Sequence, residues 1–347
     1  MKTKIIRIVL FFLAILIIPA FTLFGEKETV SYNENKTLAE FPKLTLESWK
    51  NRSFMNGMAD FMSDHFVLRE DFIRIKNKIE NVIGKNEING VFEYNGYLIQ
   101  TFKDINYSLT DKNLNSINKL KEKNNNIPFY FMPVVTAQEK YMDSLPTYLN
   151  LDSESEYMDY CFSKLNGVEK INVSEEICSI DDAFYKTDHH WTTQAAYQAY
   201  LKASESLGIV PNNSAELITI TDEFKGTLYS KTLNEDIELD SITAFKSDTE
   251  YKFTIKDEVY DSLYFDMFLT EKDKYAYFLS GNHGICTIEN TNNNNGKELL
   301  IIKDSYANCF IPFLTSDFEQ IDVVDLRFHS SSIRKLMLET EYHTVLI

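Results

Sequence analysis

The chain has 347 residues, of which 44% are hydrophobic and 14% are aromatic, and its formal net charge at pH 7 is −17. This apolar content excludes wholesale disorder and is sufficient for one large domain or two modest ones. An acidic chain repels phosphate backbones, and no basic aromatic stripe is present, so we expect no nucleic-acid ligand.

The first 25 residues differ from the rest of the chain. Lys2, Lys4 and Arg7 precede an uncharged run, residues 8–24, with the sequence IVLFFLAILIIPAFTLF. This order is typical of a signal anchor or a cleavable signal peptide, and the run is at the short end of a membrane span. No A-x-A site precedes Gly25, which favours an anchor, and the basic residues predict a cytoplasmic N-terminus. We therefore expect a protein of the cell membrane, or a secreted one if the segment is cleaved, with the remaining chain outside the cytoplasm.

The next segment, residues 26–45, is polar and predicts an extended stalk ahead of one folded domain that spans 46–347. Apolar residues at helical spacing predict two helices at the start of this domain, 47–62 and 69–83. We expect a break between them near His65.

Signals for a sheet follow the two helices. Short apolar runs on either side of Asn95-Gly96 predict a β-hairpin, and a helix is expected near 110–123. The run from Ile127 to Val135 is long enough for a buried parallel strand. Its polar continuation, 136–140, would then face the ligand side of an open α/β sheet, where such sheets bind at the carboxyl ends of their strands.

The second half of the chain alternates helical and strand patterns. The sequence TTQAAYQAYLKASESLG predicts a helix that a Thr caps and Gly208 ends. The segment 215–297 is rich in β signals, and we treat residues around 215–275 as a β-rich insertion. Further strands are expected near 275–280, 284–289 and 298–303, separated by Gly-Asn turns and an Asn-rich hairpin loop, with a helix from Asp304 onward.

The four cysteines show no metal-binding spacing. None of them forms a C-x-x-C pair, so a zinc cluster is not indicated. One or two disulfides are compatible with an exported chain, and buried free thiols are equally compatible. The residues are Cys161, Cys178, Cys286 and Cys309.

Ser305 in LLIIKDSYA is a candidate nucleophile. It follows an apolar strand and precedes an expected helix, which would expose its hydroxyl at the ligand edge of the sheet. A serine becomes nucleophilic when a histidine removes its proton, and an acid usually orients that histidine. The structural alternative is that Asp304-Ser305 only caps the helix.

The stretch TDHHWT supplies both partners. Asp188 and His190 are two positions apart and can converge in a tight turn, which would leave the second ring nitrogen of the histidine for Ser305. We assign His190 as the general base and give His189 a packing or supporting role. Asp-His-His also resembles the DHH motif of manganese phosphoesterases, but the D-x-D ligands of such sites are missing. We therefore expect neither a metal nor another cofactor.

These motifs resemble those of the DHHW family of Gram-positive bacteria. TDHHWT is followed far downstream by LLIIKDSYANCFIPFL, and NENKTLAEFP, FMSDHFVLREDF, GVFEYNGYLIQ and MPVVTAQEKYM are similar to further blocks of the family. More distantly, the chain is similar to alginate O-acetylation proteins of the AlgX/AlgJ type. The resemblance implies an α/β fold, a three-layer α/β/α sandwich like that of SGNH hydrolases, with the Asp-x-His motif ahead of the serine in a permuted order.

The resemblance also implies site residues. Asp188, His190 and Ser305 match the triad positions, although Lys303 stands where the family pattern has a glycine. Asn282 in SGNHG is a candidate oxyanion-hole donor or simply a turn residue. Arg327 would bind an anionic sugar or pair with Asp325. The full set of candidate substrate or oxyanion contacts is Asn282, His189, Trp191, Tyr306 and Arg327.

The function implied is O-acyl transfer or acyl-ester hydrolysis on a cell-surface polysaccharide. Relatives often work beside a membrane-bound O-acyltransferase (MBOAT) that supplies acetyl groups across the membrane, so such a protein is the expected partner. The alternative is a non-catalytic surface protein that binds the same kind of polysaccharide. In that case aromatic residues near strand ends, such as Tyr130, Tyr141 and Tyr306, would stack on sugars.

Overall fold

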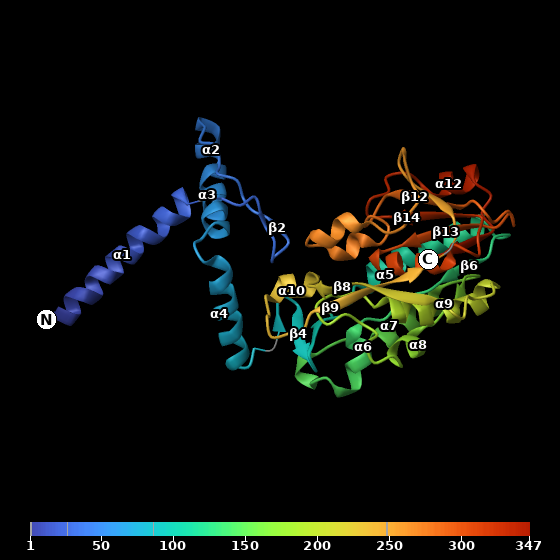
Figure 1. The fold of residues 1–347 in the computed structure, drawn as a ribbon, viewed down its shortest axis with the longest axis horizontal. Coiled ribbons are helices and arrows are strands. Elements are labelled where there is room, and N and C mark those ends of the chain that lie inside the picture. The colour runs from blue at the N-terminus through green and yellow to red at the C-terminus, as the bar shows by residue number, and fades with distance from the viewer. Residues whose placement is uncertain (1, 26, 86, 248) are drawn as a thin grey trace. The chain divides into compact units, whose positions relative to one another are not determined.

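A computed structural model describes residues 2–25, 27–85, 87–247 and 249–347 (Figure 1). Contacts between residues divide the chain into two units. Unit 1 comprises residues 1–89 and 229–236, and unit 2 comprises residues 90–228 and 237–347. Unit 1 therefore ends at residue 89 and also takes in a short later segment, and the single folded domain from residue 46 onward stays a prediction.

Unit 1 begins with a long apolar helix, α1 (Lys2–Phe24). Its residues 4–24 are long and apolar enough to cross a membrane, with a mean hydropathy of 2.7, and they are almost entirely exposed in the folded chain. A signal sequence has the same character. The predicted stalk contains a small antiparallel hairpin, β1 (Val30–Ser31) with β2 (Lys36–Thr37).

Three helices follow the hairpin in unit 1. They are α2 (Leu46–Lys50), α3 (Ser53–Asp64) and α4 (Arg69–Val82), with a short strand, β3 (Glu87–Ile88), after them. The helix predicted at 47–62 is thus two helices, because Arg52 between them adopts φ = 64°, which no α-helix accommodates. The helix predicted at 69–83 and the break near His65 are confirmed.

Unit 2 is built on an eight-stranded mixed sheet, so the predicted α/β class is confirmed. Its strand order is β11-β10-β12-β14-β13-β15-β6-β7. The half from β14 to β7 is parallel, and β12, β10 and β11 pair antiparallel. The strands are β6 (Phe129–Phe131), β7 (Glu169–Lys170), β10 (Tyr251–Ile255), β11 (Glu258–Tyr260), β12 (Ile285–Asn290), β13 (Glu298–Lys303), β14 (Gln320–Asp325) and β15 (Thr344–Leu346).

Both faces of this sheet bury apolar side chains. Alternate residues of β13 point to opposite sides, so that Leu299 and Ile301 lie in one core and Leu300 and Ile302 in the other. The first core includes residues of α9 (Thr193–Leu207) and α11 (Ile311–Leu314). The second includes residues of α5 (Tyr107–Lys123) and α12 (Ile333–Glu339). Burial on both faces explains why ELLIIK is continuously apolar.

Smaller elements complete the fold. The predicted hairpin at Asn95-Gly96 is confirmed, since both residues have the positive φ that a tight two-residue turn requires. A separate two-stranded sheet lies within the predicted β-rich insertion. The remaining elements are β4 (Val91–Tyr94), β5 (Tyr97–Gln100), α6 (Ala137–Tyr141), α7 (Glu154–Lys164), α8 (Ser174–Cys178), β8 (Glu216–Phe224), α10 (Thr227–Thr232), β9 (Asp240–Lys246) and the 3₁₀ helices Met142–Ser144, Thr147–Leu149, η3 (Asp266–Thr270), η4 (Lys274–Tyr277) and η5 (Ser305–Cys309).

Three strand predictions need correction. The strand predicted at 275–280 is wrong, because Lys274–Tyr277 forms a 3₁₀ helix and Leu279 and Ser280 have positive φ. The strand predicted at 127–135 is parallel but shorter, since prolines at positions 128 and 133 bracket β6 and cannot donate to a ladder. The Asn-rich loop does not close a hairpin, because β14 lies between β12 and β13 in the sheet.

The cysteines are free thiols. Cys161, Cys286 and Cys309 are buried and Cys178 is partly buried, and none of the four is bonded to another cysteine. Of the two alternatives drawn from the sequence, the structure contains the reduced one.

Candidate active site

A tight loop just before α9 carries the Asp-His pair. The backbone N–H of Tyr185 donates to the carbonyl of His190 at 3.2 Å, which closes the loop. The carboxylate of Asp240 accepts hydrogen bonds from the backbone N–H groups of Lys186 (2.6 Å) and Thr187 (2.8 Å) and holds one side of it. Burial raises the pKa of Asp240 to about 6. The loop therefore has a defined shape that folds the chain back on itself.

This turn brings Asp188 and His190 into direct contact. The Nδ1 atom of His190 lies 2.5 Å from Oδ1 of Asp188, and the backbone N–H of His190 donates to the same oxygen at 3.0 Å. Both residues are buried, with 2% and 5% of their surfaces exposed. The carboxylate therefore orients the ring and keeps its Nδ1 occupied, as the two-residue spacing predicted.

The second oxygen of Asp188 is held by Thr227. It accepts hydrogen bonds from the backbone N–H at 2.7 Å and from the hydroxyl at 2.9 Å. Burial by itself raises the pKa of Asp188, but the charge and hydrogen bond of His190, the charge of His189 and the backbone of Thr227 outweigh it and hold the pKa well below its usual value. Asp188 is thus an ionised carboxylate with its acceptors satisfied.

Gly226 makes room for this carboxylate. A Cβ atom at this position would lie 2.2 Å from the Cβ of Asp188 and 2.4 Å from its Oδ2, which is too close for any real contact. The glycine is therefore required by the close approach of Asp188 to the backbone ahead of α10.

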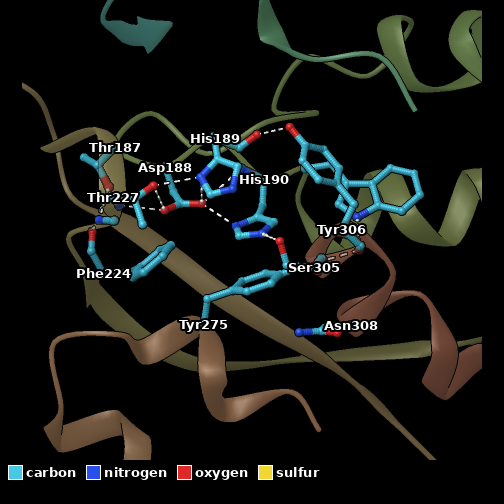
Figure 2. Close-up of polar contacts among 12 residues, drawn as sticks. Thr187, Asp188, His189, His190, Phe224, Thr227, Tyr275, Ser305, Tyr306 and Asn308 are labelled. Carbon is cyan, nitrogen blue, oxygen red and sulfur yellow. Dashed lines mark hydrogen bonds and ion pairs between the residues drawn. The ribbon is translucent and has the colours of Figure 1, made fainter. Parts of the chain in front are cut away.

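Ser305 is the third residue in this chain of hydrogen bonds. It lies two residues after the end of β13 and begins η5, and its Oγ lies 2.9 Å from Nε2 of His190 (Figure 2). Ser305, His190 and Asp188 are therefore linked in order by hydrogen bonds, in the arrangement that activates a serine hydroxyl. Asp304 also caps η5, since its side chain accepts a hydrogen bond from the backbone N–H of Tyr306. The segment Asp304-Ser305 therefore both caps a helix and places Ser305 next to His190.

The ring of His190 is sandwiched between two other rings. Tyr275 stacks on one face, with centroids 3.8 Å apart and ring planes 11° apart, and His189 lies against the other at 3.9 Å (Figure 2). The hydroxyl of Tyr275 donates to the carbonyl of Ser305 at 3.3 Å. Tyr275 therefore contacts the backbone of the serine and the ring of the histidine at once.

His189, Trp191 and Tyr306 surround the row. Nδ1 of His189 lies 2.7 Å from the hydroxyl of Thr227, and the hydroxyl of Tyr306 donates to the carbonyl of His189. Trp191 is buried and donates from Nε1 to the carbonyl of Tyr306 at 2.8 Å. These contacts hold the three side chains around Asp188, His190 and Ser305.

Lys303, two residues before Ser305, contacts two asparagine side chains. Its ammonium donates to Oδ1 of Asn282 at 2.7 Å and to Oδ1 of Asn308 at 2.5 Å. The amide NH₂ of Asn282 is therefore turned away from the lysine. Burial lowers the pKa of Lys303 to about 8. The lysine that departs from the family pattern thus anchors the neighbouring loop.

Arg327 pairs with Asp325 at the carboxyl end of β14. Its Nε and Nη2 atoms donate to the two carboxylate oxygens at 2.9 and 2.6 Å. The pair lines a cavity of about 480 Å³ at the carboxyl ends of the parallel strands, together with Trp191, Lys303 and Tyr306. This is the ligand side expected of an open α/β sheet.

The cluster of Asp188, His189 and His190 could in principle hold a cation. One ligand atom of each residue lies within 4.8 Å of the others. Both oxygens of Asp188 and both ring nitrogens of His190 are, however, engaged in the hydrogen bonds described above. A metal would have to displace those bonds, so the donor set fits a proton-transfer row better than a metal centre.

The sequence reasoning missed four residues that shape the site, namely Gly226, Thr227, Tyr275 and Asn308. Each of the first three lies far along the chain from Asp188 and Ser305. The one signal available in the sequence was the Gly-Thr pair between two β-rich stretches, and no periodicity distinguishes Tyr275 from the other aromatic residues of its segment.

Comparisons with known proteins agree with the motifs. A family model described as DHHW protein matches residues 94–324, which is more than half of the chain. A search of curated proteins finds no match.

Solved structures share the fold. A DHHW family protein from Eubacterium siraeum has 25% identity and a TM-score of 0.66, over 75% of this chain and 90% of that one. PatB1 from Bacillus cereus, with a sulfonyl adduct, has 19% identity and a TM-score of 0.62, over 74% and 93% of the two chains. A more distant match is the O-acetyltransferase domain of Pseudomonas putida AlgJ, with 13% identity and a TM-score of 0.45, over 74% and 89%.

Proposed function

The chain belongs to the DHHW family, and we propose that it is an extracytoplasmic O-acyltransferase or acyl esterase that acts on a cell-surface polysaccharide. The observation that carries this proposal is the hydrogen-bonded row from Ser305 through His190 to Asp188, with 2.9 Å between Oγ and Nε2. That separation is already within the reach of proton transfer. In this proposal α1 anchors the chain in the cell membrane.

The first half-reaction acylates Ser305. Nε2 of His190 takes the hydroxyl proton while Oγ bonds to the carbonyl carbon of an acyl ester. The resulting tetrahedral intermediate collapses as the bond to the ester oxygen breaks, and the departing alcohol leaves with the proton from His190. Asp188 keeps the ring in place and stabilises its transient positive charge.

The second half-reaction returns the serine to its starting state. A hydroxyl group loses its proton to His190 and attacks the acyl-serine carbonyl, and the proton then returns to Ser305 as the new ester or acid departs. Water as acceptor makes the chain an esterase, and a sugar hydroxyl makes it a transferase. In the transferase case the acetyl donor would be supplied by an MBOAT partner.

Asn282 is the proposed side-chain donor to the oxyanion. Because Lys303 accepts no hydrogen bond and draws Oδ1 of Asn282 toward itself, the NH₂ group is available for a developing negative charge. The backbone N–H of Ser305 is the second proposed donor. Arg327 and the cavity beside it are the proposed site for part of the polysaccharide.

The test uses the full-length chain in detergent with a sulfonyl fluoride probe and p-nitrophenyl acetate. A B. cereus structure of this fold carries a sulfonyl adduct, which makes this class of reagent a natural choice. We expect labelling of Ser305 and ester turnover in the wild type, and neither in Ser305→Ala. The matched control is Ser116→Ala, an exposed serine on α5, which should behave as wild type.

Two outcomes would contradict the proposal. One is a wild-type chain that is neither labelled nor active, and the other is equal labelling of the wild type and Ser305→Ala. Binding of a polysaccharide that survives Ser305→Ala, without turnover of any acyl ester, would identify the non-catalytic alternative. Of the three tyrosines considered for sugar stacking, Tyr130 is buried and Tyr141 packs against Tyr94 and Tyr97, whereas Tyr306 lines the cavity.

A further inference from the structure

Helix α4 exposes its apolar face. Five apolar side chains recur every three or four residues from the residue before the helix to its last residue, so they form one stripe. Each is at least half exposed. They are Leu68 (64%), Phe72 (51%), Ile75 (54%), Ile79 (55%) and Val82 (86%), and they are called the α4 stripe below.

The face on the other side of α4 is polar and packed. Nδ2 of Asn77 donates to the carbonyl of Thr232 at 2.7 Å, and Asn77 is only 6% exposed. Nε of Arg74 lies 3.4 Å from Glu235, and Glu70 accepts from Ser31 at 2.9 Å. All of these residues belong to unit 1. The helix therefore turns its polar side inward and its apolar side outward, the reverse of a surface helix in a water-soluble domain.

The start of the stripe adjoins the end of α1. The backbone N–H of Val67, one residue before the stripe, donates to the hydroxyl of Thr22 at 3.3 Å. Thr22 is fully buried, whereas most of the other α1 side chains that the structure describes are exposed. Because α1 is apolar enough to cross a membrane, this contact puts the first residue of the stripe beside the point where α1 would leave the bilayer.

We propose that the α4 stripe binds the membrane surface, so that α4 lies in the interface between lipid headgroups and acyl chains beside the end of α1. An interfacial helix of this kind combines an apolar face with a charged one and low overall hydrophobicity. Next to the stripe is a groove of about 400 Å³ lined by Ser63, Phe66, Arg69, Phe72, Ile73 and Lys76. Arg69 pairs with Glu34 and Lys76 lies 3.6 Å from Glu80, so the apolar residues of this groove are the ones that suit a lipid acyl chain.

This inference does not depend on the proposed chemistry. It rests on the exposure of the α4 stripe and on the contact between Val67 and Thr22. A second copy of the chain or another protein could cover an apolar face equally well, but neither would explain why the stripe begins at the end of the candidate membrane helix.

The test measures how deep two neighbouring positions lie in a vesicle. Full-length Ile79→Cys and Lys78→Cys chains are labelled with the fluorophore NBD and incorporated into phosphatidylcholine/phosphatidylglycerol vesicles, which are isolated by flotation. Lys78 is the matched control, because it is exposed, is rotated by about 100° from Ile79 around the helix, and its ammonium lies 3.8 Å from Asp236. Labelling of the unaltered chain gives the background from the native cysteines, three of which are buried.

The expected result is a blue-shifted NBD emission at position 79 that doxyl-labelled lipids quench, with neither effect at position 78. Equal quenching at both positions, or none at position 79, would overturn the proposal. Disulfide-linked dimers of the unlabelled Ile79→Cys chain, without quenching of its labelled form, would overturn it in favour of a second copy of the chain. The Ser305 labelling experiment is independent, so failure of one inference is distinguishable from failure of the other.

Discussion

The candidate active site and helix α4 both bury polar side chains, but only α4 leaves a set of apolar side chains exposed. At the site, charged and polar side chains are buried, and each of the described partners satisfies a specific atom of its neighbour. On α4, the polar side chains also face inward, but the apolar ones are left exposed. At the site, the arrangement depends on individual hydrogen bonds. On the α4 stripe, the property of interest is the total exposed apolar surface.

The difference predicts how each region responds to substitution. Removal of one atom from a buried polar row leaves its partner without a hydrogen bond, which costs a large fraction of the function. Removal of one side chain from an exposed stripe removes only part of a summed apolar area. We therefore expect the largest effects in the hydrogen-bonded residues of the site and small, graded ones in the α4 stripe.

The largest effect is expected from Asp188→Asn. An amide in this position favours the wrong tautomer of the His190 ring, so kcat for p-nitrophenyl acetate should fall by about four orders of magnitude.

The same variant should change how stability depends on pH. The pKa of Asp188 in the folded chain lies below the usual 3.8, so its ionised form stabilises the wild type above that pH. This advantage over Asp188→Asn should be lost as the pH falls through the acid range, as measured by urea unfolding. Asp159→Asn, an exposed position on α7, is the control, and a kcat loss below tenfold would refute the assignment.

Gly226→Ala should be next in size. The added methyl group collides with Asp188, so the carboxylate must move away from His190. Overpacking of this kind costs about 1–3 kcal/mol of unfolding free energy, and we expect ester turnover to fall by roughly 100-fold. Thermal melting and turnover measure the two effects, and Glu223→Ala, an exposed neighbour, should change neither. Unchanged activity would mean that the position of Asp188 is not critical.

Two variants of Tyr275 separate the effect of its aromatic ring from that of its hydroxyl. Tyr275→Leu removes the ring that stacks on His190, and loss of an aromatic pair worth about 1 kcal/mol predicts a fall of roughly five- to tenfold in kcat with little change in KM. Tyr275→Phe keeps the ring and loses only the hydroxyl contacts, so it should restore most of kcat. Equal losses in the two variants would assign the effect to the hydroxyl instead of the stack.

The smallest effect is expected from Ile75→Asn on α4. The side chain is exposed, so the unfolding free energy in detergent should change by less than about 0.5 kcal/mol, and ester turnover should not change. Asn77→Ala, two residues away on the packed face, should instead cost about 1–3 kcal/mol, because it leaves the carbonyl of Thr232 without its buried donor. Similar losses for the two variants would contradict the inverted orientation of the helix.

The sequence was most informative where a local pattern and the fold agree. The strand at 298–303 was predicted to the residue, because burial on both sheet faces makes it continuously apolar. The strand at 275–280 failed because its apolar residues serve a 3₁₀ helix that packs Tyr275 against the site. The pattern of apolar residues alone does not distinguish these two kinds of burial.

The grouping of Asp188, His190 and Ser305 followed from two short motifs, but the residues that support them could not be found from the sequence. Asp188 and His190 are close in sequence, and Ser305 follows a recognisable strand, so chemistry and spacing were sufficient to group them. Thr227 and Tyr275 reach the site only through the tertiary fold, and their residue types are common in ordinary cores. The role of Lys303 could not be predicted for a different reason. It depends on contacts with two asparagines, Asn282 and Asn308, which only the tertiary fold brings to it.

The free cysteines have a practical consequence for folding. Because no disulfide joins any of the four thiols, the native state draws no stability from covalent cross-links and does not require an oxidant or an isomerase to form. The melting temperature of the chain should therefore be the same with and without dithiothreitol.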